Sequence, residues 1–178
     1  MQNIAKLQDY CKENFPDYYI VPVKYEDLIF EERVKMNCFY CGKYNVSWKC
    51  PPKIPESIDF QKMFREYENL ALIYSKYYFG TDNYNMVRND STTELHNTLL
   101  KLESFLWENN NSTAISFIGG SCKLCKNGCG KERCNNPYKA RSPLEATGIN
   151  VVKTAAKYGI EISFPPKDFI IRMGMLLW

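Results

Sequence analysis

Seven of the eight cysteines fall into two short segments, and cysteine thiolates are strong ligands for zinc and for iron–sulfur clusters. The two groups are Cys38, Cys41 and Cys50, and Cys122, Cys125, Cys129 and Cys134. Within a group few residues separate the thiolates, so they can converge on one centre while little chain has to be ordered. The pattern therefore predicts that the chain binds metal through these cysteines.

The second group has the spacing of an iron–sulfur loop. Two, three and four residues separate its successive cysteines, from Cys122 to Cys134. The ligands of a [4Fe–4S] cluster approach from different directions, and Gly128 and Gly130 allow the chain to wrap around such a centre. The same four thiolates also fit a tetrahedral zinc site. The spacing favours a [4Fe–4S] cluster, with zinc as the alternative.

Basic residues surround the second group. One acid, Glu132, stands among six bases, which are Lys123, Lys126, Lys131, Arg133, Lys139 and Arg141. A four-thiolate cluster carries net negative charge, so nearby cations stabilise it and raise its reduction potential. A solvated basic loop and a docking surface for an acidic protein are the other interpretations of these charges.

The first group supplies three thiolates and leaves a fourth position open. Cys38 and Cys41 form a knuckle of the kind that binds iron or zinc, and Cys50 adds a third ligand. Cys11 falls on the apolar stripe of an expected helix, so we predict a buried thiol there. His96 lies off the leucine face of its helix, and we predict it at the surface. The remaining interpretation is a cluster with three cysteines and an open iron that binds a substrate or small ligand as a Lewis acid.

Several segments resemble an uncharacterised family of prokaryotic "predicted metal-binding proteins" (domain of unknown function 2284). They are Cys38-x-x-Cys41-x-x-Tyr44, Trp48-x-Cys50-Pro51-Pro52, Gly119-Gly120-Ser-Cys122-x-x-Cys125 and Pro137-x-x-x-Arg141-Ser142-x-x-Glu145-Ala146. The resemblance implies a metal-binding, iron–sulfur protein of a kind frequent in anaerobes, with all seven loop cysteines as ligands, and it implies no known reaction. The chain has three residues before Cys129 where the family has two.

Helices and short strands alternate along the chain around these groups. Helices are expected from the N-terminus to Phe15, from about Ser57, over residues 91–108 behind the capping box Ser91-Thr-Thr-Glu94, from Ser142, and from Asn150 to Gly159. Strands are expected over residues 19–23, 32–36, 70–79, 113–118, 160–164 and 169–178, with an exposed loop over residues 81–90. This order favours an α+β fold with a mixed or antiparallel sheet, flanked by helices and carrying two cysteine-rich metal-binding loops.

Composition limits the remaining classes. With 178 residues, 45% of them hydrophobic, the chain suits a single metal-binding domain over residues 1–178. Its polar start lacks the apolar run of a signal peptide, and no stretch approaches the about 18 apolar residues of a membrane span. We therefore expect a cytoplasmic protein, in which thiols stay reduced, without membrane association. The net charge of +3 is too small to predict nucleic-acid binding.

Together these patterns predict an iron–sulfur protein with one or two [4Fe–4S] clusters, acting in electron transfer or as an accessory to a redox enzyme. A redox protein is the expected partner. The three-cysteine centre instead suggests an enzyme with an open iron, and the Cys41 knuckle suggests a zinc-stabilised binding module without redox activity. No pattern identifies a catalytic side chain, and the phosphate-binding and dinucleotide-binding glycine motifs are absent.

Overall fold

The computed structural model describes residues 2–55 and 57–178, so Met1 and Glu56 of the predicted domain lie outside it. The helices are α1 (Gln2–Asn14), α2 (Glu32–Tyr40), α3 (Phe60–Arg65), α4 (Tyr84–Glu108) and α5 (Val151–Ala156), with the 3-10 helices η1 (Tyr25–Asp27) and η2 (Leu144–Thr147). The strands are β1 (Tyr19–Val23), β2 (Leu70–Tyr78), β3 (Ile115–Phe117) and β4 (Phe169–Leu177). The predicted α+β class is confirmed.

The four strands form one antiparallel sheet in the order β1-β2-β4-β3. The two long strands lie at its centre, with Leu70 of β2 opposite Leu177 of β4. The short strand β3 forms one edge, where Ile115 also faces Leu177. Of the two sheet types expected, the antiparallel one is present.

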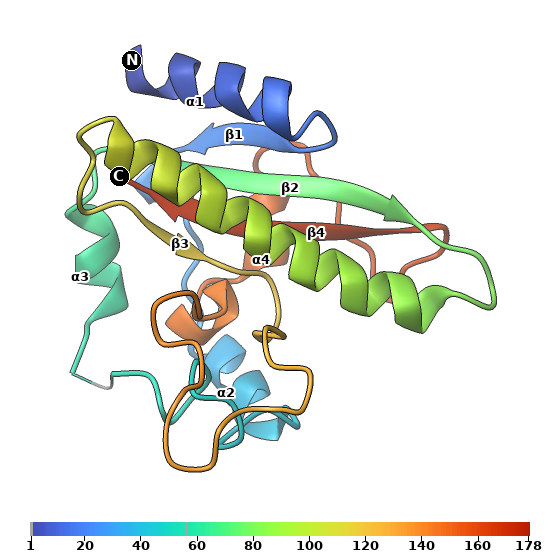
Figure 1. The fold of residues 1–178 in the computed structure, drawn as a ribbon. Coiled ribbons are helices and arrows are strands. Elements are labelled where there is room, and N and C mark those ends of the chain that lie inside the picture. The colour runs from blue at the N-terminus through green and yellow to red at the C-terminus, as the bar shows by residue number, and fades with distance from the viewer. Residues whose placement is uncertain (1, 56) are drawn as a thin grey trace.

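Alternation along β2 gives the sheet two apolar faces. Ala71 and Ile73 pack in a core that α1 and α4 cover, whereas Leu70 and Leu72 pack in a second core with α3 and α5. Figure 1 shows α4 crossing one face of the sheet with α1 beside it. Because both faces are buried, the sheet can hold the loops at its edge in a fixed position.

The second cysteine loop leaves the sheet at the end of β3 and returns to the same place. Ile118 donates its backbone N–H to the carbonyl oxygen of Ser142 at 3.0 Å, and Leu144 donates to the carbonyl oxygen of Ile118 at 2.8 Å. These bonds close the loop at its base. The loop, α2 and the first cysteine segment lie together at the bottom of Figure 1.

The strand predicted over residues 32–36 is wrong, because this segment lies in helix α2. Val34 and Met36 alternate with polar residues, and that alternation suggested a strand. Lys35 instead pairs with Glu32, three residues earlier, at 2.9 Å, as neighbours on a helix do. An alternation over five residues is too short to distinguish the two-residue period of a strand from the 3.6-residue period of a helix.

Helix α4 begins earlier than the sequence predicts. Residues 81–90 were expected as a loop, yet the helix starts at Tyr84, behind its N-cap residue Asn83. Ser91 lies inside the helix, and its hydroxyl donates to the carbonyl oxygen of Arg88 at 3.4 Å. A hydroxyl that bonds back into its own helix does not cap a new one, so the capping box predicted at Ser91 is wrong.

Towards the C-terminus the predictions have mixed outcomes. The final strand is confirmed as β4, and Asn150 caps α5 by accepting the backbone N–H of Lys153 at 3.0 Å. The helix expected from Ser142 is only the 3-10 helix η2. The strand expected over residues 160–164 is wrong, since Phe164 is 77% exposed and the segment offers no continuous apolar face.

Within residues 2–55 and 57–178, every helix is too short or too polar to cross a membrane.

Candidate metal centre

The three cysteines of the first group line one cavity. Cys38 lies in the last turn of α2, and Cys41 caps this helix, its backbone N–H donating to the carbonyl oxygen of Cys38 at 3.1 Å. The chain then turns back, with the N–H of Tyr44 bonded to the carbonyl oxygen of Cys41 at 2.9 Å. The turn brings Cys50 to the same cavity, so a helix end and a loop together gather the three thiols.

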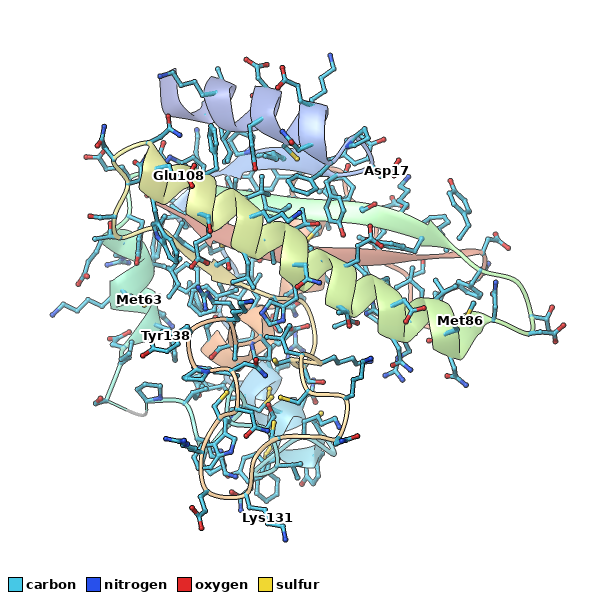
Figure 2. The ribbon with its side chains drawn as sticks, viewed as in Figure 1. Asp17, Met63, Met86, Glu108, Lys131 and Tyr138 are labelled. Carbon is cyan, nitrogen blue, oxygen red and sulfur yellow. The ribbon has the colours of Figure 1, made fainter. Side chains whose placement is uncertain are left out.

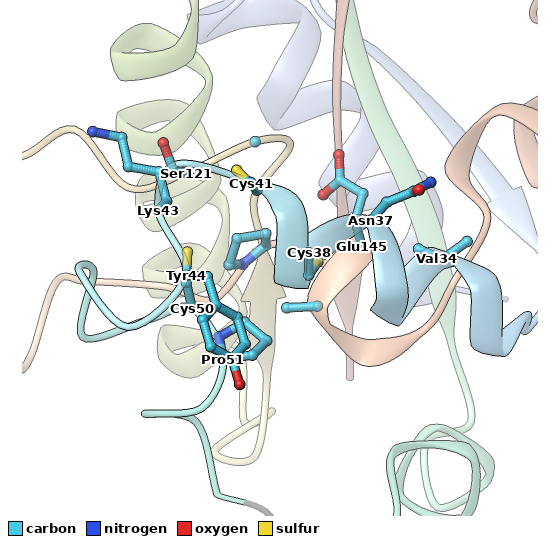
Figure 3. Close-up of a pocket in the computed structure, with 13 residues that line it drawn as sticks. Val34, Asn37, Cys38, Cys41, Lys43, Tyr44, Cys50, Pro51, Ser121 and Glu145 are labelled. Carbon is cyan, nitrogen blue, oxygen red and sulfur yellow. The ribbon is translucent and has the colours of Figure 1, made fainter.

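This cavity has a volume of about 250 Å³ and is built from three separate parts of the chain. Its polar walls include Asn37 of α2, Lys43 and Ser121 of the two cysteine segments, and Glu145 of η2 (Figure 3). The fold therefore places a carboxyl group and an amide in the walls of the cavity that the three thiols line.

The four cysteines of the second group lie around Cys122. Its thiol is half-buried, and burial raises its pKa; the neighbouring Cys129, Cys125 and Cys134 raise this pKa as well. The side-chain amide of Asn136 donates a hydrogen bond of 3.1 Å to the sulfur of Cys125. The loop thus provides four neighbouring thiols and a hydrogen-bond donor to one of them.

Trp48 joins the two cysteine loops. Its indole N–H donates a hydrogen bond of 2.7 Å to the backbone carbonyl of Gly130. Figure 2 shows the sulfur atoms of this region gathered between α2 and the loop that carries the labelled Lys131. The two groups predicted as separate centres therefore meet in one part of the molecule.

The thiol of Cys50 is buried. Its pKa is raised to about 11, mainly by burial and in smaller part by the thiols of Cys38, Cys41 and Cys122, against the opposing effect of Ser47. Metal binding requires the thiolate, so a cation at this centre has to compensate for the burial of the charged sulfur. The positive charge of a bound metal supplies that compensation.

A buried ion pair anchors the far end of the second loop. The Glu103 side chain of α4 is 1% exposed, and its carboxylate accepts hydrogen bonds from the backbone N–H and hydroxyl of Ser116 at 2.8 and 2.6 Å. Arg141 forms an ion pair with the same carboxylate, its Nε lying 3.0 Å away. The loop therefore returns to the scaffold through a fully satisfied charged contact.

His96 supports the same end of the loop, and its predicted surface position is wrong. The residue is 1% exposed, and its Nε2 lies 2.9 Å from the backbone carbonyl oxygen of Lys139. The prediction considered only the packing of α4 on the sheet. The returning loop covers a second side of this helix, which the periodicity of α4 cannot reveal.

Cys11 is a core thiol, as predicted. It is 1% exposed in the core between α1 and the sheet, and burial raises its pKa to about 11.

Glu145 is the functional candidate that sequence reasoning missed. The sequence placed Glu145 only in a family motif, at the start of an expected helix, but it lies in η2 and lines the cavity of the first group. Its neighbours Leu144 and Ala146 are buried. No local signal in the sequence reveals this position, because segments distant in sequence form the cavity.

The structure brings the cysteines together without arranging them around a single ion. Among residues 2–55 and 57–178, no three histidine, cysteine, aspartate or glutamate side chains converge on a point that could hold one metal ion. The donor set itself fits thiolate-bound metal, since three thiols and a carboxyl group line the first cavity and four thiols neighbour one another in the second loop.

Fold and site define a class of protein in which an antiparallel sheet carries two cysteine loops with seven thiols at one end. The chain belongs to a family of predicted metal-binding proteins (DUF2284), whose family model matches residues 21–178. The resemblance noted in its motifs is thereby confirmed. No curated protein and no solved structure matches the chain. The matched region contains both cysteine groups and Glu145.

Proposed function

We propose that the chain is an iron–sulfur protein that holds one or two [4Fe–4S] clusters and acts in electron transfer or as an accessory to a redox enzyme. The observation that supports this is the meeting of two all-cysteine loops, joined by Trp48, in one region of the molecule. Thiolates are the usual protein ligands of such clusters, and the single histidine is occupied elsewhere. All eight cysteines are free thiols, which suits a reducing compartment such as the cytoplasm.

Each cysteine group would hold one centre. The ligands of the first are Cys38, Cys41 and Cys50, and those of the second are Cys122, Cys125, Cys129 and Cys134. When bound, a [4Fe–4S] cluster supplies a carrier of single electrons whose potential depends on its ligands, hydrogen bonds and burial. The chain contributes the amide of Asn136 at the sulfur of Cys125, which favours the more reduced cluster, and the ammonium group of Lys43 at the first cavity.

The exposed charges around the second loop support a redox protein as partner. The exposed bases are Lys126, Lys131, Arg133 and Lys139. An acidic protein surface would bind here by charge complementarity, and it would lie close to the thiols of the second group.

The cavity at the first group favours a second candidate function. Three cysteines leave one iron of a [4Fe–4S] cluster without a thiolate, and the cavity of about 250 Å³ has room beside them for a small molecule. In that case the chain is an enzyme that binds substrate at the open iron.

Composition of the protein purified without oxygen tests the proposal. We expect brown protein with about four iron and four sulfide ions for each cluster. Cys41→Ser should remove the iron of the first centre and Cys125→Ser that of the second. Cys11→Ala is the matched control, since this thiol lies in the core, and it should retain the full iron content.

Colourless protein with stoichiometric zinc and no sulfide after oxygen-free handling would exclude the iron–sulfur function and support the zinc-stabilised binding module. Adding candidate small molecules to the reduced protein distinguishes electron transfer from catalysis, because only an open iron changes its electron paramagnetic resonance spectrum when they bind.

A further inference from the structure

We infer that Glu145 is the fourth protein ligand of the first centre, which three thiolates and one carboxylate would then hold. This inference rests on the proposed function, since it requires a metal centre in the cavity of Cys38, Cys41 and Cys50. It supplies the ligand that the cysteine pattern leaves missing.

Glu145 has a buried carboxylate oxygen without a partner. The residue is part-exposed as a whole, but its Oε2 atom is sealed from solvent and receives no hydrogen bond from any described residue. Burial raises the pKa of this carboxyl group, and the backbone of Gly120 and of Glu145 itself opposes that shift only in part. A buried carboxylate oxygen left unpaired is costly, and a bound cation is one of the few ways to satisfy it.

Glu103, a buried acid of α4, shows what a satisfied carboxylate looks like. Glu103 accepts two hydrogen bonds from Ser116 and pairs with Arg141. No ion pair within residues 2–55 and 57–178 involves Glu145. The protein therefore neutralises the carboxylate of Glu103 with its own groups and leaves Glu145, on the wall of the thiol cavity, with a buried oxygen that has no partner among the described residues.

The guanidinium of Arg172, whose charge lowers the pKa of Glu145, is already engaged. Arg172 influences Glu145 from a distance, but its guanidinium donates to the hydroxyl of Ser91 at 2.9 Å and to the carbonyl oxygen of Arg88 at 2.6 Å. These contacts hold the guanidinium against α4. Arg172 contributes a favourable charge without occupying the free oxygen.

Glu145 lies in the wall of the cavity where a fourth ligand of the first centre is needed. Figure 3 shows it close to Asn37 and Cys38, on the side of the cavity formed by α2. Cys122 is the competing candidate, but it does not line this cavity, whereas Glu145 does. The geometry thus assigns the carboxylate to the first centre and Cys122 to the second.

A carboxylate holds iron less firmly than a thiolate does, because oxygen is the harder ligand. Ferricyanide should therefore release the iron bound to Glu145 as Fe²⁺ while accepting one electron, and a three-iron cluster with its own paramagnetic signal should remain. A centre with four thiolates resists this loss.

The experiment compares oxygen-free wild-type protein with Glu145→Gln and Glu145→Cys, and uses Glu32→Gln as the matched control. Glu32 is an acid on the same part of the molecule, and its side chain is 82% exposed. Iron content, the three-iron signal and chelator resistance are measured, with circular dichroism to establish that each variant is folded. We expect Glu145→Gln to lose about one iron per chain, Glu145→Cys to resist ferricyanide, and Glu32→Gln to equal wild type.

Stability provides a readout that does not depend on spectroscopy. Glu145→Gln removes a buried unpaired charge, so it should raise the unfolding midpoint of the metal-free protein and lower that of the loaded protein. A purely structural role would change both midpoints in the same direction.

Wild-type protein without iron or sulfide would end the proposed function itself. Iron–sulfur protein whose wild-type cluster resists ferricyanide, or whose Glu145→Gln variant retains all its iron and the wild-type signal, would overturn the ligand assignment alone. A Cys122→Ser variant that lost the iron of the first centre would likewise assign the fourth position to Cys122.

Discussion

The indole of Trp48 and the backbone carbonyl of Gly130 form a hydrogen bond of 2.7 Å that joins two loops 82 residues apart in the sequence. Trp48→Phe keeps an aromatic ring but removes the donor. We expect a loss of about 1 kcal/mol in unfolding free energy and a faster loss of metal to a chelator. The matched control is Trp107→Phe, because this indole donates to the carbonyl oxygen of Ala114 at 2.9 Å, away from the cysteine loops. Equal rates of metal loss in the two variants would contradict the role given to Trp48.

Gly130 has no room for a side chain. A Cβ atom there would overlap the carbonyl oxygen of Arg133 and lie 2.5 Å from the side-chain oxygen of Asn135. Gly130→Ala should therefore distort the second loop, cost about 1–3 kcal/mol and reduce metal content. Gly42→Ala is the control, since nothing lies within 4 Å of the added atom, and it should be neutral. Metal analysis and urea unfolding of both variants check this prediction.

The ion pair between Arg141 and Glu103 should be a major stabilising contact of the second loop. Arg141→Met leaves a buried carboxylate without its cation, so we expect a loss of about 3 kcal/mol in urea unfolding. Adding Glu103→Gln to this variant should recover part of the loss. Arg33→Ala breaks an ion pair whose arginine is 68% exposed, and it should cost much less than Arg141→Met. Similar losses in the two arginine variants would argue against the anchoring role.

His96 should make stability depend on pH near neutrality. Burial lowers its pKa below the ordinary value of 6.5, so between the two values the unfolded chain binds a proton that the folded chain does not. The free energy of unfolding should therefore fall as pH decreases below about 6.5, by at most about 1.4 kcal/mol per pH unit. His96→Gln retains a donor for the carbonyl oxygen of Lys139 and should show a smaller decrease. Unfolding curves from pH 7.5 to 5.5 with equal slopes for both proteins would show that His96 does not titrate in this way.

The amide of Asn136 should tune the second centre. A hydrogen bond to a cluster sulfur favours the reduced, more negative cluster, so Asn136→Ala should lower the reduction potential. A loss of about 1 kcal/mol corresponds to about 40 mV for one electron. Asn136→Asp has the same shape but adds a negative charge, and it should lower the potential further. Potentiometric titration measures the series, and an unchanged potential in both variants would exclude the effect.

Much of the scaffold could be predicted because its signals are local. The leucines of α4 repeat at helical spacing, and the long strands β2 and β4 are largely apolar. The prediction of a strand at residues 32–36 was wrong because five residues cannot distinguish the period of a strand from that of a helix. The strand predicted at residues 160–164 failed because pairing depends on a partner that the local sequence does not specify.

The candidate site likewise has features that local sequence patterns predict and features that they do not. Cysteine spacing predicted which thiols serve each centre, and that assignment stays a prediction. The contact from Trp48 to Gly130, the burial of His96 and the position of Glu145 depend on segments distant in sequence, so no local pattern contains them. The identity of the metal stays a proposal, because iron and zinc bind the same residues.

The two apolar cores contain Cys11 and border on Cys122, and otherwise draw on none of the cysteine sulfurs. Burial of the sheet alone therefore supplies most of the folding free energy, unlike in zinc fingers, which collapse only around their ion. A newly synthesised chain should thus acquire its shape first and receive inorganic atoms afterwards. Whatever machinery delivers those atoms would recognise a finished apoprotein surface rather than an unfolded peptide.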